Sequence, residues 1–232
     1  MHSPHLARPD RSPRPTAALA GGAVCAALFV VLLALVAARW APLMSLDRTL
    51  ADALHRHAVA GPGLVRVSRV MTDWTWDPVT MRALVAAAVV ALWWRGARLL
   101  ALWVAVTSLL AALLQQGLKA AVGRERPEWP DPVDTAHYAA FPSGHAMTAA
   151  VSCGLLVWLL RLYGAGRVLW AGALGVAVVS VAGVGLTRLH LGVHWLSDVV
   201  GGVLLGGAVV ALTVAGYTWD TARRASGTAS AV

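Results

Sequence analysis

The chain has 232 residues, of which 58% are hydrophobic and only 13% are charged, and it carries a formal net charge of +8 at pH 7. Soluble domains carry about 25% charged residues, so this composition excludes an ordinary soluble fold and is typical of a polytopic helical membrane protein. The positive charge does not indicate nucleic-acid binding, because the arginines lie between apolar segments and not in a basic stretch with interleaved aromatic residues.

The N-terminal region begins with a polar segment and continues into a first apolar run. Residues 1–16 are rich in proline, arginine and serine, and we expect a disordered cytoplasmic tail there. Residues 17–38 are apolar, and as a helix they are about 33 Å long, which is enough to cross a bilayer. Since this run is longer than the apolar core of a signal peptide, we expect a retained transmembrane span.

A mixed region follows at residues 39–78. Four of its apolar residues recur at helical spacing, namely Leu46, Leu50, Ala53 and Leu54. This spacing predicts an amphipathic helix that lies at the membrane interface.

Five further apolar spans complete the chain. They are residues 79–94, 99–118, 144–160, 168–186 and 195–217. Arg82, near the start of the second span, is expected to extend toward the interface. The sequence therefore predicts one all-α integral membrane domain, residues 17–218, with six transmembrane helices in a bundle and a second cytoplasmic tail at residues 219–232.

Two short turns set the expected orientation. Six spans place both termini on one side of the membrane, and the turns 94–98 and 161–167 lie on that side with two arginines each. Short positively charged loops stay in the cytoplasm. We therefore expect a multi-pass protein of the plasma membrane with both termini in the cytoplasm.

The opposite, extracytoplasmic face gathers polar residues at the ends of four spans. These are Lys119, Arg124, Arg126, Ser143, His145, Arg188, His190, His194 and Asp198. A charged side chain at bilayer depth costs about 2.5–3.5 kcal/mol, so a group of them needs a shared reason. Extension toward the interface accounts for the arginines, but it does not account for the histidines or the aspartate. We therefore expect an active site at this interface.

Several of these residues are suited to bind a dense anion. Lys119, Arg126 and Arg188 supply positive charge, and the arginine fork matches phosphate oxygens. Ser143 and Gly144 open a helix, where free N–H groups and the helix dipole also favour an anion.

The others are suited to act on that anion. His145 and His194 offer a nucleophile and a proton donor. Asp198 lies four residues after His194, so on a helical turn its carboxylate can orient that imidazole. Together these residues predict phosphoryl transfer without a metal.

Three motifs carry a resemblance to a known family. They read KAAVGRERP at residues 119–127, PSGH at residues 142–145 and TRLHLGVHWLSD at residues 187–198. In order, spacing and membrane face they resemble the signature of the type 2 phosphatidic acid phosphatase superfamily, which is Lys-x6-Arg-Pro, Pro-Ser-Gly-His and Ser-Arg-x5-His-x3-Asp. One departure is Thr187, where the family more often has serine.

The resemblance implies a role for each matching residue. His194 is expected to be the nucleophile that forms a phosphohistidine, Asp198 to hold and polarise it, and His145 to protonate the leaving oxygen and then activate water. The phosphate is expected to bind to Lys119, Arg126, Ser143, Gly144 and Arg188. The implied activity is that of a phosphoric monoester or diphosphate hydrolase that needs no metal or other cofactor. Its substrate would be a lipid phosphate such as undecaprenyl diphosphate or phosphatidylglycerol phosphate.

Other interpretations stay open. A lipid phosphotransferase would use the same motifs with an alcohol in place of water, and a non-hydrolytic transporter or anion-binding membrane protein is a further alternative, although transporters usually place charges at the midplane. The soluble vanadium haloperoxidases share the motifs, but six spans argue against that role. We interpret Arg124 as a rim residue, His190 as an interfacial loop residue, and residues 128–138 as either a lid or a solvated loop. The sequence does not predict the oligomeric state.

Overall fold

The computed structural model describes residues 15–229, which form helices joined by short turns and by one longer segment at residues 123–143. In chain order the helices are α1 (Pro15–Ala37), α2 (Ala41–Ala60), α3 (Pro62–Val70), the π-helical turn η2 (Met71–Thr75), α4 (Pro78–Trp94), α5 (Arg98–Val122), α6 (Gly144–Leu162), α7 (Arg167–His190) and α8 (Leu196–Ala229). Six stretches of this described chain are long and apolar enough to cross a membrane, so the predicted all-α fold with six spans is confirmed. The predicted tail at residues 1–16 lies outside the described residues except for Pro15 and Thr16, which begin α1.

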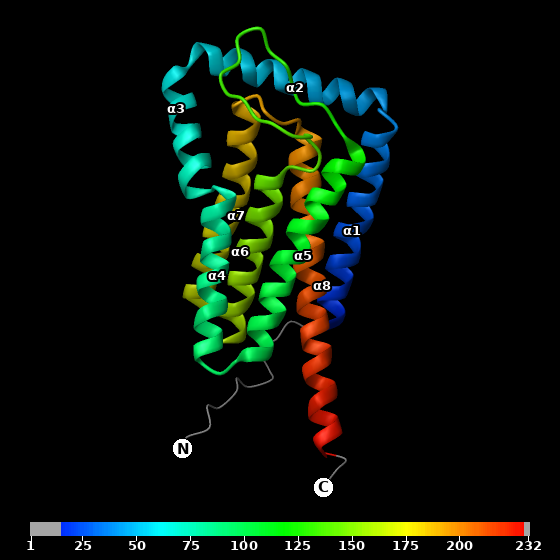
Figure 1. Ribbon diagram of the computed structural model, residues 1–232, viewed down its shortest axis with the longest axis vertical. Helices are drawn as coiled ribbons and strands as arrows, with labels where there is room; N and C mark the ends of the chain where they lie inside the picture. Colours follow the sequence, from blue (N-terminus) through cyan, green and yellow to red (C-terminus); the bar gives the residue numbers. More distant parts are fainter. Residues whose placement is uncertain (1–14, 230–232) are drawn as a thin grey trace.

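The helices run side by side as a bundle, with one exception (Figure 1). Helix α2 crosses one end of the bundle, and the segment 123–143 passes over the same end. Both ends of the described chain lie at the opposite end. The amphipathic helix expected within residues 39–78 is thus present, and its buried face consists of Asp47, Ala51, His55 and Ala58.

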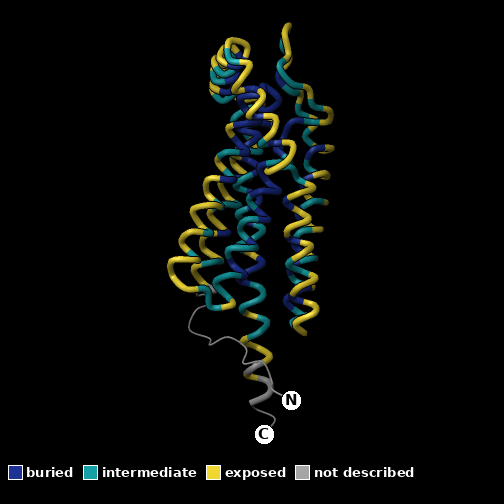
Figure 2. The backbone as a smooth tube through the Cα atoms, turned by 90° about the vertical axis from the view of Figure 1, so that its left-hand side faces the viewer, coloured by how far each residue is buried: buried dark blue, intermediate teal, exposed yellow. Residues whose placement is uncertain are grey.

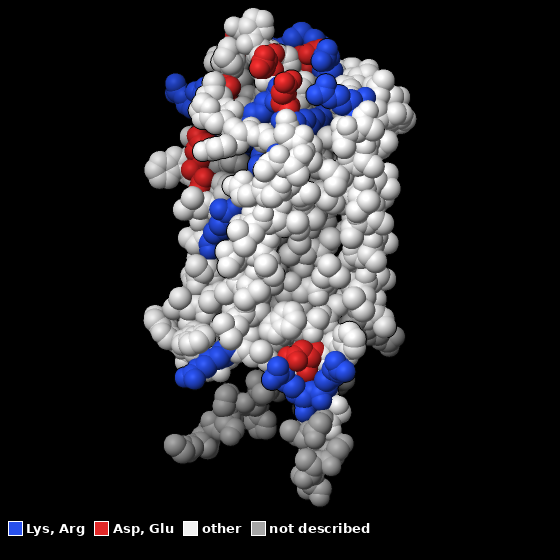
Figure 3. Space-filling view, turned by 45° about the vertical axis from the view of Figure 1, so that its right-hand side comes forward, with Lys and Arg blue, Asp and Glu red and all other residues white. Residues whose placement is uncertain are grey.

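The surface of the bundle is polar at its two ends and apolar between them. Figure 3 shows most of the visible charged side chains toward these ends, with a few along one side of the upper half and a largely uncharged surface between the two ends. Large hydrophobic side chains such as Val30, Leu113 and Val176 are exposed on the outer helices, whereas buried segments lie in the interior (Figure 2). This distribution is the one expected for a bundle whose outer surface contacts lipid, since lipid removes the penalty for exposed apolar groups.

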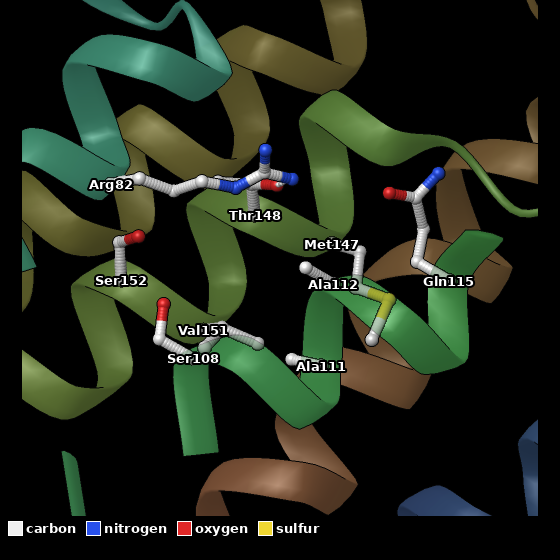
Figure 4. A pocket seen from close by; sticks show the side chains of 9 residues that line it. All are labelled: Arg82, Ser108, Ala111, Ala112, Gln115, Met147, Thr148, Val151 and Ser152. Carbon is white, nitrogen blue, oxygen red and sulfur yellow. Dashed lines mark hydrogen bonds between the residues drawn. The ribbon is translucent and has the colours of Figure 1, made fainter. Parts of the chain in front are cut away.

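The second span is longer than predicted. The sequence places it at residues 79–94, but helix α3, the turn η2 and α4 together form a candidate span from Pro62 to Trp94. Arg82 lies near the start of α4, which is the apolar part of this stretch. Its guanidinium donates to the Thr148 hydroxyl of α6 at 3.3 Å, and both side chains line a small pocket between α4, α5 and α6 (Figure 4). Arg82 thus has a polar partner on α6, while the residue as a whole is exposed.

Three other helices also extend past the predicted ends. Helix α5 continues to Val122, α7 to His190 and α8 to Ala229, where the sequence predicts ends at residues 118, 186 and 217. The difference arises because hydropathy marks where apolar residues stop, whereas the helical hydrogen bonds continue through polar residues. As a result Lys119 and Arg188 project from helices rather than from loops, which restricts their positions.

Helix α8 packs closely on α6 through glycines. A Cβ atom at Gly202 would lie 2.6 Å from the carbonyl oxygen of Ser143, and one at Gly206 would lie 2.8 Å from the Cβ of Ala150. Side chains do not fit at such distances, so glycine permits this approach. The Ser143 N–H then donates to the backbone carbonyl of Asp198 at 2.9 Å. The starts of α6 and α8 are thereby held next to each other.

Candidate active site

The residues that the three motifs contribute meet at the end of the bundle that α2 covers. Lys119 comes from the last turn of α5, and Arg126 from the segment that follows it. Ser143 and the first residues of α6 approach from a second direction, and Arg188 comes from the last turn of α7. His194 lies in the turn between α7 and α8. The charges of Lys119, Arg126 and Arg188 all act on the imidazoles of His145 and His194, so the predicted site residues are brought together.

His194 and Asp198 form a buried pair. The Nδ1 atom of His194 lies 3.3 Å from Oδ2 of Asp198, and the two residues are 1% and 0% exposed. The same Oδ2 accepts the backbone N–H of Trp195 at 2.8 Å. Asp198 is the third residue of α8, and a carboxylate there that reaches back to the preceding N–H stabilises the helix start. One carboxylate therefore both caps α8 and orients the imidazole.

The other nitrogen of His194 faces Arg126. Its Nε2 atom lies 3.2 Å from a terminal nitrogen of Arg126, which can only donate. Nε2 is therefore the acceptor, and the proton of the neutral ring resides on Nδ1, where Asp198 accepts it. Burial, with a further contribution from the positive charge of Arg126, lowers the pKa of His194 well below its ordinary value. The ring is neutral near pH 7 and keeps a lone pair on Nε2.

Backbone carbonyls hold the two cations of the first motif. Lys119 donates from Nζ to the carbonyl of Ala139, and Arg126 donates from Nε to the carbonyl of Tyr138 at 2.8 Å. A terminal nitrogen of Arg126 also donates to the carbonyl of Val193 at 2.5 Å. The segment before α6 thus returns over the site and fixes both cations, each of which has further N–H groups for an anion.

Helix α6 begins at this site with Ser143 as its N-cap. The Ser143 hydroxyl accepts the N–H of Ala146 at 3.5 Å, while the N–H groups of the first turn have no acceptor within the helix. Gly144 packs closely on α5, because a Cβ there would lie 3.0 Å from the side-chain nitrogen of Gln115, which would have to shift. The helix start therefore presents backbone N–H groups beside His145.

Arg188 is buried and incompletely paired. It is 5% exposed, and its Nε atom is buried without a hydrogen-bond partner. A buried guanidinium donor that lacks an acceptor is costly unless a ligand provides one. The hydroxyl of its neighbour Thr187 donates to the carbonyl of Val184 at 2.9 Å in the same helix. The hydroxyl at the position where the family more often has serine is thus paired within α7.

The loop at residues 128–138 is anchored at several points. The indole N–H of Trp129 donates to the carbonyl of Gly192 at 2.9 Å, and its ring stacks on His55 of α2 at 4.0 Å. His55 also contacts the carboxylate of Asp131 at 3.0 Å. The loop is therefore tied to α2 and to the turn that carries His194.

Two sequence interpretations near the site are wrong. His190 is not a loop residue, since it is the last residue of α7, is buried, and contacts the ring of His57 edge-on at 5.6 Å. Arg124 is not a rim residue, since its side chain is only 11% exposed and donates to both Asp47 and Asp198. Asp47 is a site neighbour that the sequence analysis missed.

Comparison with known proteins tests the resemblance. A family model described as the PAP2 superfamily matches residues 100–222, which is more than half of the chain. The chain belongs to the PAP2 superfamily. The match contains all three motifs, so the resemblance stated from the sequence is confirmed.

Two curated PAP2 relatives have similar sequences over part of their length. Decaprenylphosphoryl-5-phosphoribose phosphatase of Mycobacterium tuberculosis (strain ATCC 25618 / H37Rv) is 40% identical over 98 residues, which cover 41% of this chain and 49% of the relative. Phosphatidylglycerophosphatase B of Bacillus subtilis (strain 168) is 34% identical over 99 residues, which cover 40% of this chain and 46% of the relative. The chain thus spans about half the length of the curated relatives it matches.

A solved PAP2 structure has the same fold. The crystal structure of a transmembrane PAP2 type phosphatidylglycerolphosphate phosphatase from Bacillus subtilis matches with a TM-score of 0.73. The match covers 83% of this chain and 94% of that one, at 23% sequence identity. At this identity the likeness establishes the transmembrane fold, and with the six apolar stretches it makes this PAP2 chain a multi-pass membrane protein.

Proposed function

We propose that this PAP2 protein is a metal-independent hydrolase that removes a phosphate from a lipid phosphate or diphosphate through a phosphohistidine. The observation that carries the proposal is the environment of His194. Its neutral ring has the proton on Nδ1 toward Asp198 and the lone pair on Nε2 beside Arg126, within a group of cations that includes an incompletely paired Arg188. The names of the curated PAP2 relatives, both phosphatases of phosphorylated lipids, support the same substrate class.

In the first step Nε2 of His194 attacks the phosphorus atom. The P–N bond forms while the P–O bond to the leaving group breaks, and His145 gives its proton to the leaving oxygen. Arg126, Arg188 and Lys119 bind the phosphoryl oxygens and stabilise the charge that develops on them. Asp198 stabilises the Nδ1–H of the imidazole as positive charge develops on the ring.

In the second step water releases the phosphate. His145, now neutral, accepts a proton from the water molecule while its oxygen attacks phosphorus. The P–N bond breaks, inorganic phosphate leaves, and both histidines return to their starting protonation states. No metal is needed for these two steps, because the three cationic side chains supply the positive charge that stabilises the phosphoryl oxygens and His194 supplies the nucleophile.

The position of the site suits a substrate anchored in the same membrane. The site residues lie at one end of the largely uncharged surface, where the phosphate of an embedded lipid is found. The arginine-containing turns after α4 and after α6 lie at the other end, together with both ends of the described chain. With those turns in the cytoplasm, the site faces the extracytoplasmic side of the plasma membrane.

Phosphate release in the presence of a chelator tests the proposal. We expect purified protein in detergent to release inorganic phosphate from at least one of a panel of lipid mono- and diphosphates, at the same rate with and without EDTA. Added alcohol acceptors should not become phosphorylated. Loss of release with EDTA that added Mg²⁺ restores would refute the metal-independent mechanism, and phosphorylated alcohol would identify a transferase.

The low pKa of His194 predicts the pH dependence of the reaction. A lowered pKa favours the neutral imidazole, so the nucleophile stays unprotonated as the pH falls through 6.5, the usual value. We expect kcat/KM, corrected for ionisation of the substrate phosphate measured by ³¹P NMR, not to decline as the pH is lowered from 8 to about 6.5, whereas loss of the His145 proton lowers it toward the basic end of this range. A corrected acidic limb with its midpoint at or above pH 6.5 would contradict the assignment of His194 as a buried neutral nucleophile.

A further inference from the structure

A buried cluster lies behind the His194–Asp198 pair and joins it to α2. Arg124 donates from one terminal nitrogen to Oδ1 of Asp198 at 2.6 Å and from the other to Oδ2 of Asp47 at 2.7 Å. The Ser197 hydroxyl contacts Arg124 at 2.6 Å and donates to Oδ2 of Asp47 at 2.5 Å, and the Ser197 N–H donates to Oδ1 of Asp47 at 2.9 Å. The two aspartates are 1% and 0% exposed.

This cluster fixes the orientation of the Asp198 carboxylate. Oδ2 of Asp198 is held by His194 and by the N–H of Trp195, and Oδ1 is held by Arg124. With both oxygens bound on opposite sides, the carboxylate plane cannot rotate without losing a contact. Arg124 also lies 5.7 Å from the centre of the Trp195 ring, which restricts the guanidinium further.

The charges in the cluster explain how Asp47 contributes to the stability of the buried Asp198 carboxylate. A buried carboxylate is stable only with a charged or hydrogen-bonding partner, and Arg124 serves Asp198 in this way. Arg124 in turn is held in place by Asp47, which approaches from an element outside the bundle. An open pocket of about 660 Å³ lies between α2, the end of α1 and the segment at residues 122–129, and both Asp47 and Arg124 line it. The pair thus separates Asp198 from this pocket.

We propose that Asp47 and Arg124 are positioning residues for the nucleophile, through which α2 holds Asp198 and so keeps Nε2 of His194 directed at the phosphate. Neither residue contacts the substrate. The inference rests on the proposed phosphohistidine mechanism, and it assigns a role in that reaction to α2, which contributes no residue to the three motifs.

The test uses four variants of the full chain purified in detergent. Arg124→Gln removes the bridge, and Arg124→Lys keeps the charge without the fork that reaches both carboxylates. The double variant Asp47→Asn with Arg124→Gln removes one charge of each sign, so the net charge of the cluster is unchanged. Asp52→Asn is the matched control, because Asp52 lies on α2 and lines the same pocket but takes no part in the cluster.

We expect kcat to fall about 10- to 100-fold in Arg124→Gln, as for loss of a group that orients a reactive ligand, while KM changes less than about threefold. The kcat of the double variant should equal that of Arg124→Gln, with no additional decrease from the Asp47 substitution, because Asp47 acts through Arg124. Arg124→Lys should recover part of kcat, and Asp52→Asn should equal wild type.

The outcomes separate this inference from the proposed function. The positioning role is wrong if both the double variant and Arg124→Lys are monodisperse and have a kcat within about twofold of that of Asp52→Asn. Losses confined to KM, or to thermal stability with kcat intact, would also overturn it, since they indicate a structural contact only. Absence of phosphate release by the wild-type protein would instead refute the proposed function.

Discussion

Replacing His194 with alanine is expected to lower kcat about 10⁴-fold or more, which corresponds to about 5 kcal/mol in the activation barrier. The large effect follows because the variant has no atom to form the covalent intermediate, and groups that act as one catalytic unit lose most of their effect when one is removed. The measurement is phosphate release from a lipid phosphate by protein purified in parallel with wild type.

The control for this variant is His137→Ala. His137 lies on the exposed loop, so the same substitution there should leave kcat unchanged. Trapping a phosphorylated protein from ³²P-labelled substrate gives a second readout, and the label should be present in wild type and absent in the His194 variant. Phosphate release by the His194 variant within about tenfold of wild type would show that another group is the nucleophile.

Replacing His145 with alanine is expected to slow hydrolysis of a lipid phosphate about 10²- to 10⁴-fold, the usual range for loss of a general acid or base. The two steps should respond differently to the leaving group. A substrate with a weakly basic leaving group, such as p-nitrophenyl phosphate, needs no proton in the first step. The variant should then form phosphohistidine from this substrate and hydrolyse it slowly, so that a burst of p-nitrophenol precedes a slow steady rate.

The burst distinguishes His145 from a residue that only binds phosphate. Arg188→Gln serves as the comparison, since Arg188 binds phosphoryl oxygens in both steps and its loss should slow p-nitrophenol release without producing a burst. Equal slowing of the lipid and the p-nitrophenyl substrates in His145→Ala, with no burst, would exclude the general acid role.

The sequence predicts the site more completely than it predicts the helix ends. The four-residue spacing of His194 and Asp198 predicts that they face each other, and the structure confirms this at 3.3 Å. Consecutive spans cross the membrane in alternate directions, so the ends of α5 and α7 that carry Lys119 and Arg188 are predicted to lie on the same side, and they do. Hydropathy does not detect where α5 and α7 end, because their last turns contain polar residues that are buried against the site and not exposed to water.

The role of Arg124 was not predictable from the same patterns. Its partner Asp47 is distant in the sequence, and a charged residue in an amphipathic helix is usually exposed to water. One signal was present: Asp47 shares a helix face with Ala51 and Ala58, and these small residues form the side of α2 that packs on the bundle. The apolar residue Leu46, which helped to predict an amphipathic helix at the interface, lies outside this buried face and is exposed.

The largely uncharged surface between the two ends of the bundle (Figure 3) keeps the protein in the bilayer, where the proposed lipid substrate also lies. A protein with this surface diffuses in the plane of the bilayer, as does a lipid with a phosphorylated headgroup. Their encounter rate therefore depends on a surface density, the mole fraction of that lipid among its neighbours, and not on the amount per volume of solution. Dilution of the substrate with inert lipid slows such a reaction even when the total quantities of substrate and protein are unchanged.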